Sequence, residues 1–216
     1  FIARGAAGEF WLGSYGSAAA VIRERLESFV IADDVVVEDV TEQWAAVSVV
    51  GKGAFDAAKE AAQAIGGGIV FRGRRTRTEN AEWVFPVAQT SAVRERLAGA
   101  VEVDAEKMER WRIAARIAAV PTEVGPADLP GEGDLEAEAI SYTKGCYLGQ
   151  EVMARLRSMG QVRRRLLRVA ATGAVPEKLP VTLWVAERAV GEVRSAVSDG
   201  AGGWIGLAML TLLHVG

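Results

Sequence analysis

The chain has 216 residues, half of them hydrophobic and a quarter charged, and its net charge is −3 at pH 7. This is the composition of a globular protein with enough apolar side chains for a core, and it excludes a disordered chain. The slightly acidic balance supplies no overall basic field, so direct nucleic-acid binding is not expected. The single cysteine, Cys146, excludes an internal disulfide. Unpaired cysteine is typical of reducing compartments, which predicts a cytoplasmic protein.

No apolar run approaches the ~20 residues that a membrane helix needs, so no membrane partner is expected. The sequence begins with Phe1 rather than Met, and its first recognisable element is already a strand. We therefore expect that an N-terminal part of the fold is missing from it.

Strand and helix patterns alternate in the first half of the chain. Strands are predicted over 9–12, 35–40, 44–50, 69–72 and 82–87, and helices over 18–30, 54–65, 91–98 and 104–117. Over 9–72 the order strand, helix, strand occurs twice. That order is typical of a ferredoxin-like βαββαβ unit, so the prediction is an α+β fold that contains one.

The stretch 119–143 is rich in proline and glycine, and almost all of its charges are acidic. Long connections of this kind inside compact domains are often functional. Short β-like segments follow at 166–170, 181–185, 190–197 and 204–213, separated by turn residues. They predict a C-terminal antiparallel β-barrel. The expected domains are a first region over 1–118 that contains the ferredoxin-like unit, a connecting segment over 119–160 and the barrel over 161–216.

The segment Lys144–Glu151 reads Lys-Gly-Cys-Tyr-Leu-Gly-Gln-Glu. Gly145 and Gly149 flank Cys146, and glycine permits close backbone approach and positive φ angles. A helical pattern begins at Gln150, so the N–H groups at the start of that helix and the lysine of the motif both favour a thiolate. These features predict a reactive thiol. The alternative is a buried structural cysteine, a common role for this residue type.

The same eight residues resemble the hallmark motif of YgfZ-type folate-binding proteins, which share the fold of the glycine-cleavage T-protein. The resemblance is clear over 104–213 and weaker over 1–100. Further matching pieces are Leu129-Pro130-x-Glu132, a strand over Ala139–Thr143, Gly160-x-Val162-x-Arg164-x-Leu166, Val190-Gly191-x-Val193-x-Ser195 and Ile205–Ala208.

The resemblance implies a T-protein-like fold that binds tetrahydrofolate or a related reduced folate in a central channel. It makes the region 1–118 a partial folate-binding, T-protein-like region. It also implies a role in maturing or maintaining iron–sulfur enzymes, including enzymes that modify tRNA. The catalytic residues it implies are Cys146 and Lys144. The folate-binding or motif residues it implies are Gly145, Tyr147, Gly149, Gln150, Glu151, Arg155 and Arg112.

Two departures from the T-protein pattern argue against aminomethyl transfer. Ala114 stands where that family has a glutamate that holds the pterin, and Arg116 replaces a glycine. The T-protein's catalytic aspartate belongs to a segment upstream of any residue present here. A folate-dependent one-carbon transferase therefore remains an alternative, as does a non-catalytic interaction scaffold.

One cysteine and one histidine, His214, cannot supply the four ligands of a conventional iron–sulfur cluster. No metal site is predicted in this chain, so any iron–sulfur chemistry must concern a cluster on a partner enzyme or one shared between chains.

Two arginine runs are visible. The first follows the motif and is interpreted either as a solvated surface or as an anion site for a folate glutamate tail or RNA phosphate; it comprises Arg155, Arg157, Arg163, Arg164, Arg165 and Arg168. The second is interpreted as an exposed hairpin and comprises Arg72, Arg74, Arg75 and Arg77.

Overall fold

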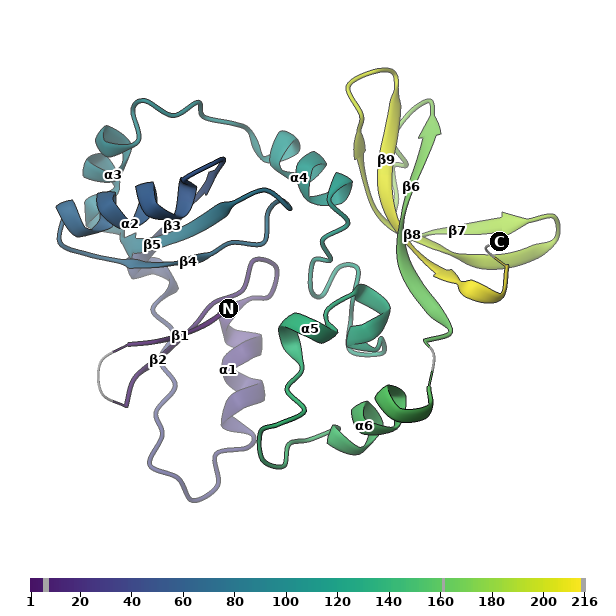
Figure 1. Cartoon of the computed structure of the whole chain (residues 1–216), viewed down its shortest axis with the longest axis horizontal. Helices are drawn as coiled ribbons and strands as arrows, with labels where there is room; N and C mark the ends of the chain where they lie inside the picture. Colours follow the sequence, from purple (N-terminus) through teal and green to yellow (C-terminus); the bar gives the residue numbers. More distant parts are fainter. Residues whose placement is uncertain (6–7, 161, 215–216) are drawn as a thin grey trace. The chain divides into compact units, whose positions relative to one another are not determined.

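The protein is described from a computed structural model that covers residues 1–5, 8–160 and 162–214, without the side chains of Met159 and His214. The chain forms two compact units, Phe1–Met108 and Glu109–Gly216 (Figure 1). Within the described residues, none of the helices has the length and apolar character required to cross a membrane.

The first unit is built on a three-stranded antiparallel sheet. The sheet order is β3-β5-β4, with β5 between two strands that are parallel to each other. Its elements are β1 (Ile2–Arg4), β2 (Phe10–Leu12), α1 (Ala19–Glu27), η1 (Thr41–Gln43), β3 (Trp44–Val50), α2 (Ala54–Ala64), β4 (Ile69–Arg72), β5 (Asn80–Pro86), η2 (Val87–Gln89) and α3 (Thr90–Arg96).

Helix α2 covers one face of this sheet. Alternation along β5 places Ala81, Trp83 and Phe85 on the helix side. Ala58 and Ala62 of α2 meet them, and their small side chains let the helix approach closely enough to leave Trp83 fully buried. This cluster is the core of the first unit.

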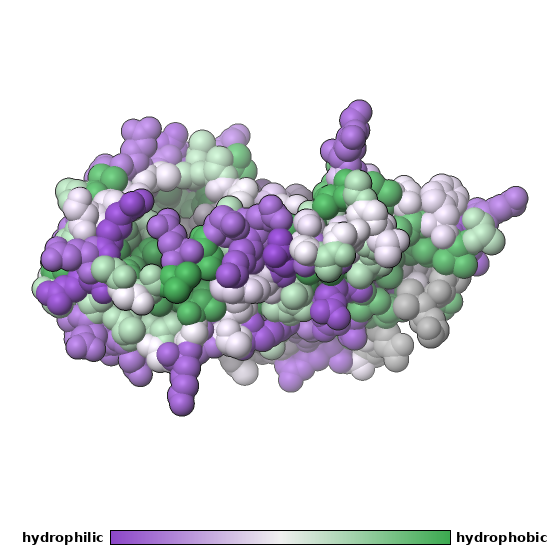
Figure 2. Space-filling view, turned by 90° about the horizontal axis from the view of Figure 1, so that it is seen from above, coloured by the Kyte–Doolittle hydropathy of each residue, from purple (hydrophilic) through white to green (hydrophobic). Residues whose placement is uncertain are grey.

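The hairpin β1–β2 lies on the opposite face of the sheet. The ring of Phe1 lies 4.1 Å from that of Phe71, and the ring of Trp11 lies 4.6 Å from that of Trp44. Helix α1 has no buried residue, and several large apolar side chains of the segment before Thr41 are exposed. The space-filling view shows apolar side chains reaching the surface among hydrophilic ones (Figure 2).

The predicted strand over 35–40 is wrong. This segment has no strand, and the side chains of Val35 and Val36 are 55% and 79% exposed. β-Branched residues favour a strand only where a neighbouring strand completes the ladder and the side chains pack. Strand β2 pairs with β1 instead. The described residues therefore contain only the second half of the predicted double unit, which is β3-α2-β4, and strand β5 lies between β3 and β4 in the sheet.

The second unit ends in a four-stranded antiparallel sheet of order β6-β9-β8-β7. This confirms the mixed α+β class and the antiparallel C-terminal sheet, but closure into a barrel is not seen among the described strands. Helix α4 (Ala105–Ala114) spans the boundary between the two units. The further elements of the second unit are η3 (Pro130–Gly133), α5 (Glu136–Ala139), α6 (Gln150–Met159), β6 (Arg164–Thr172), β7 (Val181–Val185), β8 (Arg188–Ser198), β9 (Gly203–Thr211) and η4 (Leu212–His214).

Two predicted strands of this unit differ from the structure. The strand expected to end at Leu213 ends at Thr211 and gives way to a short 3₁₀ turn. The strand expected over Ala139–Thr143 is absent, because α5 ends at Ala139 and the following residues form no ladder.

Both faces of the C-terminal sheet are apolar because side chains alternate along β9. Leu207 and Met209 join one cluster with Ile113, Val124 and Leu135, whereas Ala208 and Leu210 join another on the opposite face. The connection between α4 and α5 is therefore packed on one face of this sheet.

A buried carboxylate lies on the hairpin-covered face of the first sheet. Glu82 is 2% exposed; Ser48 Oγ donates to its Oε2 at 2.7 Å, and Arg75 Nε donates to its Oε1 at 3.3 Å. Burial raises the pKa of Glu82 above its usual value, and the contacts with Ser48, Arg75 and Tyr15 offset only part of this effect.

We expect Glu82→Gln to change the pH dependence of stability. Because the folded-state pKa of Glu82 is raised, wild type holds a proton that the unfolded chain has lost. This contribution is fully present below the unfolded pKa of about 4.3 and is lost as the pH rises through the folded value. Amide exchange of β3 and β5 from pH 4 to pH 8 should show the stability of wild type falling relative to Glu82→Gln.

Glu79→Gln is the control with the opposite sign. Hydrogen bonds from the N–H groups of Gly53 and Phe55 lower the pKa of Glu79, so its contribution is lost as the pH falls. The same trend in both variants would contradict the assignment for Glu82.

Candidate functional site

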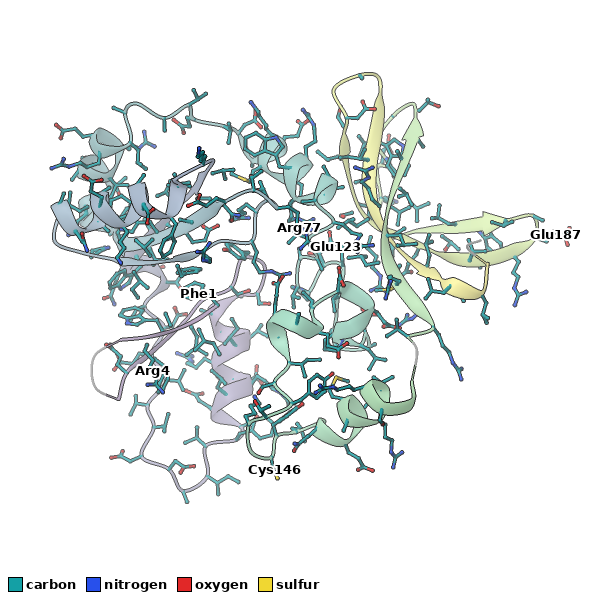
Figure 3. All side chains as sticks on the ribbon, in the orientation of Figure 1. Phe1, Arg4, Arg77, Glu123, Cys146 and Glu187 are labelled. Atoms are coloured by element: carbon teal, nitrogen blue, oxygen red, sulfur yellow. The ribbon has the colours of Figure 1, made fainter. Side chains whose placement is uncertain are left out.

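The motif loop joins α5 to α6. Gly149 has a φ of +86° and stands immediately before α6, where a residue with a side chain would be strained. The N–H of Gln150 donates to the carbonyl of Tyr147 at 3.2 Å. Gly145 has no positive φ, so of the two motif glycines only Gly149 is required by its backbone conformation. Cys146 is a free, exposed cysteine on this loop (Figure 3).

Lys144 and Tyr147 contact each other across Cys146. The Nζ atom of Lys144 lies 4.6 Å from the ring centroid of Tyr147, which is the geometry of a cation–π pair. Tyr147 is half-buried, and its hydroxyl oxygen is buried without a hydrogen-bond partner. Among the described residues the same holds for the side-chain oxygens of Gln89 and Ser195. Tyr147 Oη is therefore a buried polar atom of the motif that the described residues leave without a hydrogen bond.

Other predicted site residues lie nearby on α6 or on the loop. Glu151 and Arg155 form an exposed ion pair, with Oε1 and Nη2 2.6 Å apart. The guanidinium of Arg157 lies 4.2 Å from the ring centroid of Tyr142, whose hydroxyl donates to Glu136 at 2.5 Å. These contacts tie α5 and α6 to the motif loop from both sides.

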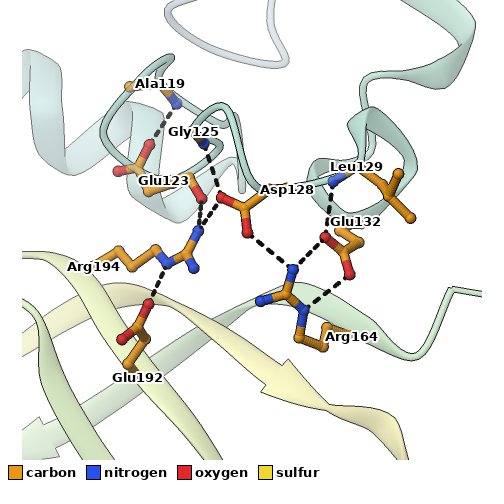
Figure 4. A network of polar contacts seen from close by, with 9 residues as sticks. All are labelled: Ala119, Glu123, Gly125, Asp128, Leu129, Glu132, Arg164, Glu192 and Arg194. Atoms are coloured by element: carbon orange, nitrogen blue, oxygen red, sulfur yellow. Dashed lines mark hydrogen bonds and ion pairs between the residues drawn. The ribbon is translucent and has the colours of Figure 1, made fainter. Parts of the chain in front are cut away.

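The two ends of the motif segment are clamped together. Arg164 Nε donates to Glu132 Oε1 at 3.0 Å, and its Nη2 donates to Oε2 at 2.8 Å (Figure 4). Glu132 is 4% exposed and also accepts a hydrogen bond from the N–H of Leu129. The Leu-Pro-x-Glu and Gly-x-Val-x-Arg pieces therefore meet in a bidentate ion pair, although their charged residues are 32 positions apart.

Asp128 extends this clamp to a second strand. Its carboxylate accepts from Arg164 at 3.0 Å, from Arg194 of β8 at 2.5 Å and from the N–H of Gly125 at 2.8 Å. Burial alone would raise the pKa of Asp128, but these partners hold it below its usual value. Arg194 also pairs with Glu192 at 2.8 Å. The connection is thus held to both β6 and β8.

Arg112 lies in a buried ion pair. It is 5% exposed, and its two terminal nitrogens donate to Glu123, which is fully buried, at 3.1 and 2.6 Å. It also donates to Glu109 and to the carbonyl of Ile117. Burial alone would lower the pKa of Arg112, but the hydrogen bonds to the carboxylates raise it above its usual value. The donors of Arg112 are directed at these protein groups. Its role in folate binding stays a prediction.

Arg116 replaces the glycine of the T-protein pattern in a left-handed conformation. Its φ is +53°, and it pairs at 3.0 Å with Asp134, whose φ is +62°. Glycine reaches this region without the steric cost that a residue with a side chain pays, so Arg116 is held in a conformation that glycine adopts more readily.

Sequence reasoning missed Glu123, Asp128 and Arg194. The acidic bias of 119–143 was visible, and so was the arginine run after the motif, but neither pattern indicates which charges meet. The available signal was that acidic residues precede the motif and basic residues follow it. Arg163, Arg165 and Arg168 of that run are exposed, whereas Arg164 is engaged by the clamp.

The described residues contain no cluster of three or more His, Cys, Asp or Glu side chains suited to a metal ion. The side chain of His214 lies outside this description.

Sequence comparison with known proteins identifies relatives of this chain. The chain matches the family model of the CAF17 C-terminal beta-barrel domain over residues 163–216. It is 35% identical over 98 residues to the mouse iron–sulfur cluster assembly factor IBA57, mitochondrial, covering 40% of this chain and 26% of that protein. The human protein of the same name is 45% identical over 49 residues, covering 22% and 14%. The tRNA-modifying protein YgfZ of Vibrio vulnificus is 36% identical over 74 residues, covering 34% and 22%.

The second unit therefore carries a CAF17-type C-terminal domain. Together with the similarity of the chain to IBA57 and YgfZ proteins, this domain match confirms the resemblance found from the motif. The matched segments span between 14% and 26% of the length of these relatives.

We expect Arg164→Lys to loosen the motif segment. Lysine keeps the charge but cannot form the two parallel hydrogen bonds to Glu132. Because Arg164 is partly exposed, the expected loss is about 1–2 kcal/mol in the free energy of unfolding. Amide exchange over 133–163 should speed up.

Arg165→Lys is the matched control, since Arg165 is the exposed neighbour on the same strand. It should change stability by no more than about 0.5 kcal/mol. Equal effects of the two substitutions would show that the clamp does not hold the segment.

Proposed function

We propose that this chain is part of a folate-binding protein that matures or maintains iron–sulfur enzymes, with Cys146 as its reactive group. The observation that carries the proposal is the exposed cysteine on a loop whose two ends are joined by the Glu132–Arg164 clamp. The names of the relatives, an iron–sulfur cluster assembly factor and a tRNA-modifying protein, supply the biological class.

The motif loop has the properties of a reactive thiol site. Cys146 is open to solvent, and Lys144 brings a positive charge to the same turn. Helix α6 begins within a few residues, so its first N–H groups and its dipole add positive potential near the thiol. A structural cysteine would instead be buried among apolar side chains.

Tetrahydrofolate or a related reduced folate is the proposed cofactor. Tyr147 fits such a ligand, because its buried hydroxyl has no partner within the described protein and a buried hydroxyl normally has one. The ring of Tyr147 is held by Lys144, so the hydroxyl is presented in a defined orientation. Folate would supply a one-carbon carrier, and this chain's contribution is to bind and orient it beside Cys146.

The cluster that the protein serves is proposed to belong to a partner enzyme. One cysteine cannot complete the usual set of four ligands, so the proposed contact with the cluster is a transient one through the exposed side chain of Cys146. A folate-dependent one-carbon transferase is the competing function; Ala114 occupies the position of its pterin-binding carboxylate.

We expect tetrahydrofolate to bind with a dissociation constant in the micromolar range, about −8 kcal/mol, in calorimetric titration. Tyr147→Phe should weaken binding about tenfold, because it removes one hydrogen bond of about 1.4 kcal/mol. Tyr142→Phe is the control, since the hydroxyl of Tyr142 already has Glu136 as its acceptor.

No binding by wild type would reject folate as the cofactor. Full affinity of Tyr147→Phe would place the ligand elsewhere in the protein.

We expect Cys146→Ser to keep the fold and to abolish the maturation activity. Serine is nearly isosteric, and the side chain is exposed, so the melting temperature should change by less than about 2 °C. In cells that depend on this protein, the activity of iron–sulfur enzymes should fall to the level of the deletion. Iodoacetamide at pH 7 should alkylate wild type faster than free cysteine, and Lys144→Gln should slow the reaction.

Normal iron–sulfur enzyme activity with Cys146→Ser would support the alternative of a non-catalytic interaction scaffold. A much lower melting temperature of the variant would show that Cys146 has a structural role.

A further inference from the structure

The hairpin that joins β4 to β5 in the first unit carries a strongly basic loop. Four of the six residues from Arg72 to Arg77 are arginines. The whole chain carries a net charge of −3, so this loop is a local reversal of the overall balance. The proposed folate and thiol chemistry of the second unit makes no use of it.

The loop is built rather than irregular. Asn80 is 6% exposed, and its side-chain oxygen accepts from the N–H of Arg75 at 3.1 Å. Its side-chain nitrogen donates to the carbonyls of Thr76 at 3.1 Å and Thr78 at 2.8 Å. A Cβ at Gly73 would collide with the same side chain, so a glycine is required there. One buried amide thus sets the course of the loop.

The inner side of this loop is hollowed. A depression of about 540 Å³ is bordered by both charged and hydroxyl-bearing residues; its wall comprises Arg72, Gly73, Thr76, Arg77, Thr78, Glu79 and Asn80. Its volume is in the range of small-ligand sites. Guanidinium groups are typical of oxyanion recognition, because arginine forks match phosphate oxygens in pairs.

The acidic groups nearby are already engaged. Glu79 accepts from the N–H of Gly53 at 2.8 Å and of Phe55 at 3.2 Å, at the start of α2. Glu82 pairs with Arg75 beneath the loop. The guanidinium of Arg72 lies 5.3 Å from the ring centroid of Phe55, which holds it in place at the wall.

We propose that this depression binds a compact phosphate-bearing ligand, such as a nucleotide or a phosphorylated small molecule, through the guanidinium groups of Arg72 and Arg77. Both arginines line the depression. The hydroxyl of Thr76 donates to the carbonyl of Thr78 at 3.0 Å and lies 2.8 Å from the hydroxyl of Thr78, so these two side chains shape the wall between the arginines. A phosphate can accept from both guanidinium groups. The site lies wholly within the first unit and is independent of the proposed folate site.

The test is a calorimetric titration of the full chain with inorganic pyrophosphate and with 5′-AMP. The double variant Arg72→Gln, Arg77→Gln should lose at least tenfold in affinity. The matched control is Arg94→Gln, Arg96→Gln, which removes the same charge from exposed positions of α3 outside the depression. It should bind within twofold of wild type, and thermal melts should show that both variants remain folded.

Three results would overturn the proposal. The first is the absence of saturable binding to wild type, and the second is an equal loss of affinity in both double variants, which would indicate general charge attraction. The third is binding of a single-stranded RNA oligonucleotide that pyrophosphate does not displace, which would make the loop part of a nucleic-acid surface. A more conservative pair, Arg72→Lys and Arg77→Lys, guards against misfolding: it keeps the charge but should still lose affinity for pyrophosphate, because the paired fork contacts are gone.

Discussion

The ion pair between Glu132 and Arg164 is the contact on which the second unit depends. Both carboxylate oxygens are used, and Asp128 shares the same guanidinium while it also binds Arg194. Carboxylates that are almost fully buried are tolerated only with such partners, because an isolated buried charge would cost several kcal/mol. The pairing therefore selects one path for a connection that has little regular structure of its own.

The clamp also explains how one loop can be both fixed at its ends and exposed in its middle. Its ends are tied to β6 and β8 through buried groups, while residues 143–146 between them are exposed. Exposed segments with few buried contacts open at little cost, whereas paired and buried ones do not. A partner can reach Cys146 without disturbing the sheet, and the sheet still determines where Cys146 is presented.

Local sequence patterns predicted the strands whose bounds are set by their own residues and by the turns beside them. The strands Trp44–Val50, Ile69–Arg72 and Val181–Val185 have the predicted bounds, because alternation and flanking turns define them. The segment 35–40 has the same β-branched character but no neighbouring strand, and a pattern within one segment cannot supply a partner. The motif could be recognised from the sequence because its eight residues are consecutive. The contacts of Glu123, Asp128 and Arg194 were not predictable, because they join residues far apart in the chain.

The arginine run after the motif shows why a charge pattern alone does not define a site. On β6, alternation places Arg164 on the same face as Leu166, which belongs to the cluster under the connection. Arg165 falls on the other face and is exposed. These two adjacent arginines therefore differ in role: Arg164 pairs with the carboxylates of Asp128 and Glu132, whereas Arg165 is exposed to solvent. Any anion site in this run is expected to use arginines other than Arg164, because withdrawing Arg164 would leave two nearly buried carboxylates with fewer cationic partners.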